Sequence, residues 1–305
     1  RSVSRGLGDV YKRQLPRGFN NVSSENLAEL SKLFNDHISR SHPDCSWVHI
    51  YPESHTRNQG YVENIATIKA MIESAGYECT VGSPDLNGLE AVHGISGPLL
   101  LTDVALNDDD ELTVNGSKPD LILLNNDLTD GNIPGVQSTN ITPPPHMGWY
   151  RRRKSQHYEA LRPYILEMAE LIDIDPWHLM PDWFVSENKC LEEEACRAKL
   201  AGEIDEFLDG LREKYRSLGI EREPTVVIKN DSGTYGLGVM MLTSGDQILN
   251  LSNRKANKLR YAKGGANVDN FLIQEGIPTA LSTEDGETLE PVVYLVDGEA
   301  ASWFY

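Results

Sequence analysis

The first half of the chain alternates between segments with helical and with strand-like patterns of apolar residues. Apolar side chains recur every three or four positions over 24–38 and 61–75, which predicts two amphipathic helices. Gly76 stands where a left-handed residue commonly ends a helix. Short apolar runs at 47–51 and 77–81 flank the second helix and predict strands. A strand–helix–strand unit implies a parallel sheet, so the pattern predicts an α/β fold.

Polar segments follow two of the predicted strands. One is the loop that comes after 47–51, and the other is a turn rich in Asn and Asp after a third apolar run, 120–124. In open α/β sheets, ligands bind beyond the carboxyl ends of the strands. The candidate substrate ligands at these ends are Glu53, Arg57, Asn58, Asn126 and Asp127. A capping or turn role explains the same residues equally well, because Asn and Asp are favoured in turns.

Three consecutive prolines separate the two halves of the chain. Residues 143–145 cannot lie inside a helix or a central strand, so they predict a rigid loop and a domain boundary near residue 150. Helical patterns follow at 158–172 and 190–218. Apolar runs typical of strands come next, at 225–229, 238–242, 270–276, 291–296 and 301–305. We therefore expect an N-terminal α/β domain over 15–150 and a second domain over 151–305.

Composition narrows the class of protein. The 305 residues are 39% hydrophobic, and 28 Lys and Arg face 46 Asp and Glu, which gives a net charge of −18. This apolar content supports a sizeable core and excludes wholesale disorder. An acidic chain without a bilayer-length apolar run is a poor general binder of nucleic acid or membranes. The four cysteines lack zinc-site spacing and the histidines form no metal motif, so we predict no metal site here and a cytoplasmic location.

Both ends of the chain differ from the rest. Residues 1–14 hold four basic residues and one acid, and the stretch 7–14 resembles a translated sequencing adapter. We therefore interpret 1–14 as an adapter-derived artefact and exclude it from fold reasoning. The other end stops inside the apolar run 301–305. From this we expect a fragment that lacks its C-terminal part.

The segment 225–242 carries the most informative chemistry. An apolar strand ends at Lys229, and three glycines follow before a second apolar strand. Glycines let backbone N–H groups turn toward an anion, so this loop could hold phosphates together with the lysine. The glycine order matches neither a P-loop nor a dinucleotide-binding turn, and the H-R-D motif of protein kinases is absent. Taken alone, the segment is explained about equally well by an ordinary glycine-rich hairpin.

A longer series of motifs resembles a known family. The order of Lys229, the glycine-rich hairpin, the QEGIP segment 274–278 and the apolar hairpin 291–299 resembles the ATP-grasp superfamily. Over about 20–305, the chain resembles bacterial glutamate–cysteine ligases of the ATP-grasp, glutathione-synthetase-like type. The stretches that carry this resemblance are 42–78, 118–131, 141–158, 227–240 and 271–276.

The resemblance implies roles for individual residues. ATP would be bound by the strand lysine, the glycine-rich loop, the hinge segment and a second lysine, namely Lys229, Ser232, Gly233, Thr234, Tyr235, Gly236, Gly238, Gln274, Glu275, Ile277 and Lys154. In the hinge, backbone groups would meet the adenine and the acidic side chain would meet the ribose. Arg151 and Arg152 would clamp ATP phosphates or glutamate carboxylates, with Lys229 and Arg151 serving catalysis. A solvated basic patch is the alternative for these arginines.

The family joins the γ-carboxylate of L-glutamate to the amine of L-cysteine at the expense of ATP, as the first step of glutathione biosynthesis. The carboxylate is first activated as an acyl phosphate, which demands a clamped γ-phosphate and exclusion of water. The resemblance implies ATP and Mg²⁺, with the Mg²⁺ ligands beyond residue 305, so the chain by itself would be inactive. The expected partners are these small molecules, and a homo-oligomer stays open. The alternatives are another ATP-grasp carboxylate–amine ligase or a non-catalytic nucleotide-binding protein of the same fold.

Overall fold

The computed structural model divides into two compact units. The described residues are 18–129, 131–136, 140–233, 238–260, 270–278, 281–287, 289 and 291–304. The described residues up to Gly148, together with those from 289 onward, form what we call the N-terminal unit. Those from Trp149 to 287 form the second unit. None of the described helices combines the length and the apolar composition that a membrane span requires.

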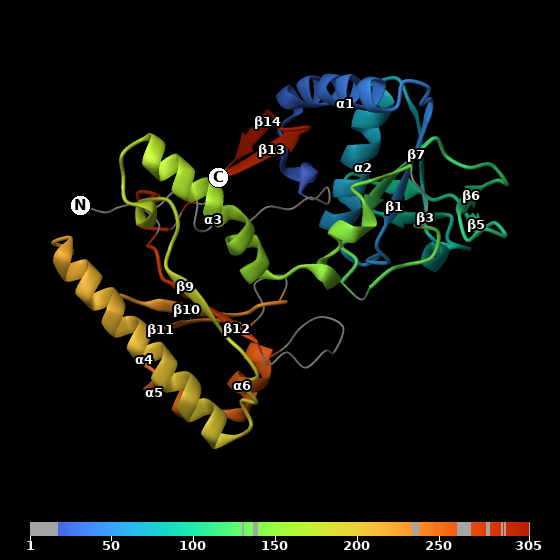
Figure 1. Ribbon diagram of the computed structural model, residues 1–305. Coiled ribbons are helices and arrows are strands. Elements are labelled where there is room, and N and C mark those ends of the chain that lie inside the picture. The colour runs from blue at the N-terminus through green and yellow to red at the C-terminus, as the bar shows by residue number, and fades with distance from the viewer. Residues whose placement is uncertain are drawn as a thin grey trace. The chain divides into compact units, whose positions relative to one another are not determined.

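The N-terminal unit contains a four-stranded parallel sheet in the order β2-β1-β7-β8. Its strands are β1 (Trp47–Pro52), β2 (Glu78–Val81), β7 (Leu121–Asn125) and β8 (Ile141–Thr142). Helix α2 (Gln59–Ser74) connects β1 to β2, and α1 (Leu27–Ser41) packs against α2 (Figure 1). All of β7 is buried, as is typical of a parallel strand covered on both faces. The predicted strand–helix–strand unit, its parallel sheet and the α/β class are confirmed.

The C-terminal hairpin packs in the N-terminal unit. It consists of β13 (Val292–Val296) and β14 (Glu299–Phe304), and Figure 1 shows it beside α1. Tyr294 and Val296 enter the same hydrophobic core as α1 and β1. The sequence analysis had grouped this hairpin with a domain over 151–305, and the contacts correct that grouping. The reason is that the apolar side of the hairpin is buried against α1, a contact that strand pattern alone does not specify.

Several short elements of the N-terminal unit were not predicted. Strands of two or three residues show no alternation, and a single 3-10 turn shows no helical period, so neither leaves a pattern in the sequence. They are η1 (Phe19–Asn21), η2 (Ser24–Asn26), η3 (Pro84–Leu86), β3 (Ala91–His93), β4 (Pro98–Leu100), β5 (Val104–Leu106), β6 (Leu112–Val114) and η4 (Pro145–Met147). Strands β3 and β4 pair as one hairpin, and β5 and β6 as another.

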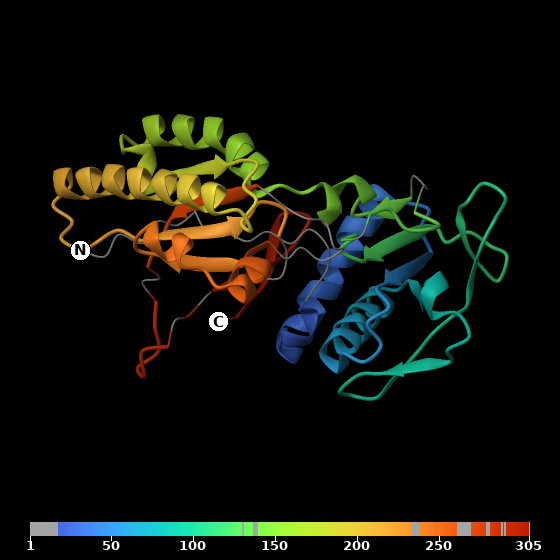
Figure 2. The same cartoon turned by 90° about the horizontal axis from the view of Figure 1, so that it is seen from below.

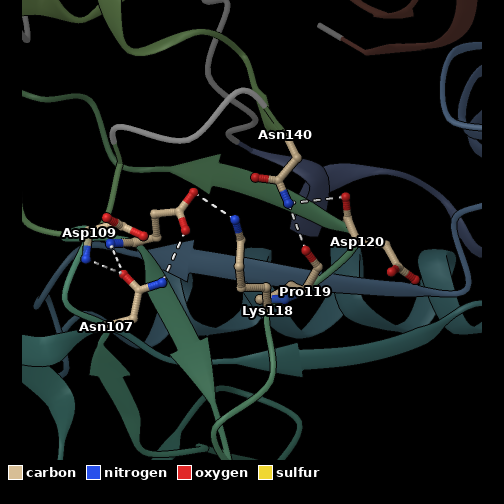
Figure 3. A network of polar contacts seen from close by, with 7 residues as sticks. Asn107, Asp109, Lys118, Pro119, Asp120 and Asn140 are labelled. Atoms are coloured by element: carbon tan, nitrogen blue, oxygen red, sulfur yellow. Dashed lines mark hydrogen bonds and ion pairs between the residues drawn. The ribbon is translucent and has the colours of Figure 1, made fainter.

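Side chains align the strands of the parallel sheet at their starts. The Asn140 amide donates to the carbonyl oxygens of Pro119 at 2.6 Å and Asp120 at 3.1 Å, just before β7 (Figure 3). The Asp120 carboxylate accepts from the backbone N–H groups of Ser46 at 2.9 Å and Trp47 at 3.0 Å. Because β1 and β7 start level with each other, their carboxyl ends also meet at one edge of the sheet.

The second unit contains an antiparallel sheet in the order β11-β10-β12-β9. The strands are β9 (Trp183–Ser186), β10 (Val226–Asn230), β11 (Val239–Leu242) and β12 (Phe271–Glu275). The helices are η5 (Trp149–Arg151), α3 (Lys154–Leu171), η6 (Pro176–His178), α4 (Glu194–Ser217), α5 (Asp246–Leu249) and α6 (Asn253–Arg260). Helix α4 runs along the strands in Figure 2 and buries its apolar side against β10 and β12. The predicted long helices and strands are confirmed, whereas β9, α5 and α6 were not predicted.

Candidate functional site

Strands β10 and β12 bring Lys229 to Gln274. These residues lie 45 positions apart, and Lys229 Nζ donates to Gln274 Oε1 at 2.9 Å. Antiparallel pairing sets Val227 opposite Gln274 and Lys229 opposite Leu272. Since side chains alternate along a strand, these residues share one side of the sheet, which we call the lysine face. The opposite side packs against α4.

Lys154 lies close to Lys229, at the start of α3. Its Nζ donates to the carbonyl oxygens of Asn230 at 2.7 Å and Gly233 at 2.6 Å. The pKa of Lys154 is lowered to about 8, first by burial and also by the like charge of Lys229, against the opposing carboxylate of Asp231. Two lysines from distant parts of the sequence therefore form a local positive site in an acidic chain.

Asp231 fastens the start of α3 to the end of β10. Its carboxylate accepts from the backbone N–H of Ser155 at 2.8 Å and from the Ser155 hydroxyl at 2.7 Å. The Asp231 carbonyl oxygen accepts from the Lys154 N–H at 3.0 Å. Tyr158, one turn further along α3, donates to Gln274 Oε1 at 3.0 Å. The sequence analysis missed Asp231, Ser155 and Tyr158, because nothing local marks a partner 76 or 116 positions away.

An apolar strip lies beside the lysines on the same face. Val239 pairs with Lys229, and Met241 pairs with Val227, so all four side chains share the lysine face. Val239 and Met241 are exposed, and Val227 is half-buried. An exposed apolar strip next to two cations suits a ligand that has a flat apolar part and an anionic part. The sequence analysis had treated these residues only as strand formers.

The glycine-rich loop is described only at its ends. Ser232 and Gly233 follow β10, where their N–H groups donate to the Asn230 side chain at 2.9 Å and the Asn230 carbonyl at 3.0 Å. Gly238 has φ +68°, and a Cβ there would lie 2.7 Å from a backbone carbonyl oxygen of α6, so this position requires glycine. The expected ligands Thr234, Tyr235 and Gly236 lie outside the described residues.

Glu275 points away from the lysine face. Its carboxylate is fully buried, with Trp177 Nε1 donating to it at 3.0 Å and the Tyr215 hydroxyl at 2.6 Å. The expectation that this side chain meets a ribose is therefore corrected. Gln274 and Glu275 are consecutive in β12, so their side chains must face opposite sides of the sheet. Ile277, after the end of β12, is half-buried.

The three arginines directly before α3, Arg151 to Arg153, differ in their exposure and contacts. Arg151 is exposed, whereas Arg152 is half-buried and its guanidinium carbon lies 5.8 Å from the centre of the Trp149 ring. Arg153 donates to the Arg152 carbonyl at 2.9 Å. The positive charge of Arg152 is among those that lower the pKa of Lys154. The run thus adds to the positive potential around Lys154.

A second cluster lies at the carboxyl ends of β1 and β7 in the N-terminal unit. Glu53 and Asp127 are buried side by side, and the Asp127 N–H donates to Glu53 Oε1 at 3.0 Å. His55 Nε2 lies 2.5 Å from Glu53 Oε2. The Tyr61 hydroxyl accepts from the Glu53 N–H at 2.7 Å and donates to the Asn125 carbonyl at 3.0 Å. This is the sheet edge at which the sequence placed its substrate candidates.

The other three substrate candidates at this edge are not part of the buried pair formed by Glu53 and Asp127. Asn58 is the N-cap of α2, and its side chain accepts from the Tyr61 N–H at 3.2 Å. Asn126 Oδ1 accepts from the Leu128 N–H at 2.9 Å, which is a turn contact. Arg57 is exposed. For Asn58 and Asn126, the structure thus shows the capping and turn contacts that the sequence analysis had left open.

A pocket lies next to Glu53. The hollow measures about 250 Å³ including open solvent, and Glu53, His55, Thr56 and Tyr61 line one side of it. The other side is apolar and is formed by Val62 and Ile65 of α2, Val81 of β2 and three residues of the segment after β2, namely Leu86, Val92 and Leu99. In the described part of the chain, no three His, Cys, Asp or Glu side chains converge on a metal position.

Comparison with known proteins places this architecture in a family. The model of the glutamate-cysteine ligase family matches residues 3–305. The match thus begins inside 1–14, the segment set aside on composition, which lies outside the described residues. A search of curated proteins gives no match.

Two solved structures are similar to this chain. A candidate gamma-glutamylcysteine synthetase from Methylobacillus flagellatus KT has 32% identity and a TM-score of 0.76, over 88% of this chain and 64% of that one. The chain thus spans less than two thirds of this relative. D-alanyl-alanine synthetase A from Vibrio cholerae O1 biovar eltor has 8% identity over 84% of this chain and 64% of that one, and its TM-score of 0.39 carries no argument. The family match, which covers nearly the whole chain, shows that this protein belongs to the glutamate–cysteine ligase family.

Proposed function

We propose that this chain belongs to an ATP-dependent ligase of the ATP-grasp type that joins the γ-carboxylate of L-glutamate to the amine of L-cysteine. The product is γ-glutamylcysteine, the precursor of glutathione. Membership of the glutamate–cysteine ligase family supports the reaction. In this proposal the second unit binds ATP, and the N-terminal unit binds an amino-acid substrate.

The observation that carries the proposal is a pair of neighbouring lysines near the end of β10, with Lys229 on the lysine face and Lys154 at the start of α3. Lys229 is held by Gln274, and Lys154 is held by two backbone carbonyls. Because the two ammonium groups repel each other, an anion bound between them is favoured electrostatically. A nucleotide fits this arrangement, since its phosphates are anionic and its base can cover the strip of Val239 and Met241.

The residues on the lysine face have distinct roles in this proposal. Lys229 and Lys154 hold phosphate oxygens while the glutamate γ-carboxylate attacks the γ-phosphorus of ATP and ADP leaves. The cysteine amine then attacks the carbonyl carbon of the acyl phosphate, gives up a proton, and inorganic phosphate leaves as the amide bond forms. Tyr158 and Gln274 orient Lys229, and Asp231 holds Lys154 in place through the start of α3. A divalent metal bound with the nucleotide would neutralise part of the phosphate charge. We assign it no ligand among the described residues.

Nucleotide binding and turnover test this proposal. Calorimetric titration of the chain with ATP and Mg²⁺ should show binding that Lys229→Ala weakens. On the full-length reading frame that contains this sequence, ADP release should require both glutamate and cysteine, and mass spectrometry should detect the γ-linked dipeptide. Loss of a charge-assisted contact worth about 2–4 kcal/mol at the transition state lowers kcat/KM by roughly 30- to 1000-fold.

Lys199→Ala is the matched control, because Lys199 is an exposed lysine on α4 of the same unit. It should leave both ATP binding and turnover unchanged. Wild-type turnover in Lys229→Ala would contradict the assignment of the lysine face. ADP release that is indifferent to cysteine would instead indicate a ligase with another acceptor.

A further inference from the structure

A buried network of hydrogen bonds fixes the end of β12, the strand that carries Gln274. The Glu275 side chain has no exposed surface, and its carboxylate accepts from Trp177 Nε1 of η6 at 3.0 Å and from the Tyr215 hydroxyl of α4 at 2.6 Å. Burying a charge is unfavourable unless it is hydrogen-bonded, so these donors hold the carboxylate firmly in one place. The last residue of β12 is therefore fastened to two helical elements on the side of the sheet opposite the lysine face.

Arg222 extends this network to the surface of the second unit. Its guanidinium donates to the Tyr215 hydroxyl at 2.9 Å, and the guanidinium carbon lies 5.3 Å from the centre of the Tyr215 ring. Burial and the hydrogen bond to Glu275 raise the pKa of Tyr215 above its usual value of 10, against the hydrogen bond from Arg222, which lowers it. The hydroxyl therefore stays protonated at neutral pH and remains a donor to Glu275.

The backbone at the end of β12 is held as closely as the Glu275 side chain. The Glu275 N–H donates to the Asp182 carbonyl at 2.9 Å, and the Gly276 N–H donates to the Thr225 carbonyl at 2.7 Å. A Cβ on Gly276 would lie 2.2 Å from Thr225 Oγ1, so glycine permits a close approach that a larger residue would disturb. The end of β12 therefore has little freedom to shift relative to the chain on either side of it.

Gln274 connects this fixed strand end to the lysine face. Its Oε1 accepts from Lys229 Nζ at 2.9 Å and from the Tyr158 hydroxyl at 3.0 Å. Since Gln274 and Glu275 are consecutive in β12, a displacement of Glu275 moves the Gln274 backbone with it. Hydrogen bonds weaken steeply as their distance and angle depart from the optimum, so a displaced Gln274 would hold Lys229 less well.

We propose that Glu275 is a positioning residue for the anion site, which it serves from the far side of the sheet together with Tyr215 and Trp177. Its carboxylate does not contact the nucleotide. The two hydrogen bonds that it accepts fix Gln274, and Gln274 in turn fixes Lys229. This role rests on the proposed function, in which Lys229 binds the phosphates of ATP. The buried carboxylate thus sets the geometry of the site in addition to stabilising the fold.

Calorimetric titrations of the 305-residue chain with ATP and Mg²⁺ test this role through two variants. Tyr215→Phe keeps the ring but removes a donor to Glu275, so the dissociation constant for ATP should rise roughly fivefold or more. Glu275→Gln has one acceptor oxygen instead of two and should raise it roughly threefold or more. Because Glu275→Gln leaves no buried unpaired charge, it keeps the test decisive if Tyr215→Phe fails to fold. Tyr164→Phe, at an exposed tyrosine of α3, is the matched control and should change nothing.

A double-mutant cycle separates positioning from a general weakening of the fold. If Tyr215 acts through Lys229, then Tyr215→Phe in the Lys229→Ala background should raise the dissociation constant by less than about twofold, because the group that it positions is gone. A merely structural loss would raise the dissociation constant by the same factor in both backgrounds. That equal rise would overturn the positioning role.

The positioning role and the proposed function can fail separately. If Lys229→Ala weakens ATP binding while Tyr215→Phe and Glu275→Gln bind ATP as tightly as the wild type, the positioning role is refuted and the ATP site stands. If Lys229→Ala binds ATP as tightly as the wild type, Lys229 does not hold the phosphates, and both the assignment of the lysine face and the role of Glu275 are refuted.

Discussion

The strand that leads to Glu53 contains a buried histidine whose protonation should control the stability of the N-terminal unit. His49 lies in β1 with no exposed surface. Its Nε2 is 2.9 Å from the Gly82 carbonyl, and its Nδ1 is 2.8 Å from the Thr80 hydroxyl. That hydroxyl accepts from Trp47 Nε1 at 2.9 Å. Because a carbonyl can only accept, these contacts assign the proton to Nε2 and leave Nδ1 as the acceptor from Thr80.

The size of the effect follows from the shift of the His49 pKa. Burial lowers this pKa from 6.5 to about 4, against the hydrogen bond to Gly82, which acts to raise it. Below pH 6.5 the unfolded chain takes up a proton that the folded chain refuses until about pH 4. The contribution of the neutral His49 to the free energy of unfolding is therefore fully present above pH 6.5 and is lost as the pH falls toward 4. The total loss is about 3 kcal/mol, at up to about 1.4 kcal/mol per pH unit.

The comparison of His49→Gln with the wild type isolates this effect. Gln does not titrate, so the difference in free energy of unfolding between the two proteins should shrink by about 3 kcal/mol from pH 7.5 to pH 4. Hydrogen exchange of β1 peptides in increasing urea reports the unit that contains His49. His93→Gln replaces an exposed histidine of the same unit and is the control. Parallel pH curves for the wild type and His49→Gln would refute the reasoning.

Three further predictions concern the second unit. In calorimetric titrations of the wild-type protein, the dissociation constant for ATP should rise between pH 8 and 9.5 as Lys154 loses its proton. Lys154→Arg should flatten this rise, because arginine stays charged over this pH range. Asp231→Ala leaves the buried Ser155 donors without their acceptor and should cost about 1–3 kcal/mol in urea unfolding. Gly238→Ala should lower the melting temperature, since a Cβ would meet a backbone oxygen at 2.7 Å and φ is +68°. Gly202→Ala should raise it, because Gly202 faces open space on α4 and alanine favours the helix more than glycine does.

Local patterns in the sequence were sufficient to predict the main elements. The period of apolar residues identified α1, α2 and α4, because the residues that share a helix face are only three or four positions apart. The order of strand, helix and strand likewise predicted the parallel sheet, since two parallel strands need a crossover between them. The polar segments after β1 and β7 were each predicted to lie beyond the carboxyl end of a strand, and the structure brings Glu53 and Asp127 into contact there.

The tertiary structure decided which candidate side chains meet. Lys154 reaches Gly233 across 79 positions of sequence, and no spacing rule predicts such a contact. Gln274 and Glu275 appeared as one binding segment, yet strand pairing turns the first toward Lys229 and buries the second against Trp177 and α4.

The sequence by itself therefore determined the main helices and strands, the parallel sheet and the residue types at its edge. Strand register, the position of the hairpin β13–β14 and the partners of each charged side chain were decided only by the tertiary structure. The physical reason is that helical and strand periods express contacts between near neighbours in the chain. Register and packing depend on which distant surfaces bury the most apolar area and satisfy the most buried polar groups together.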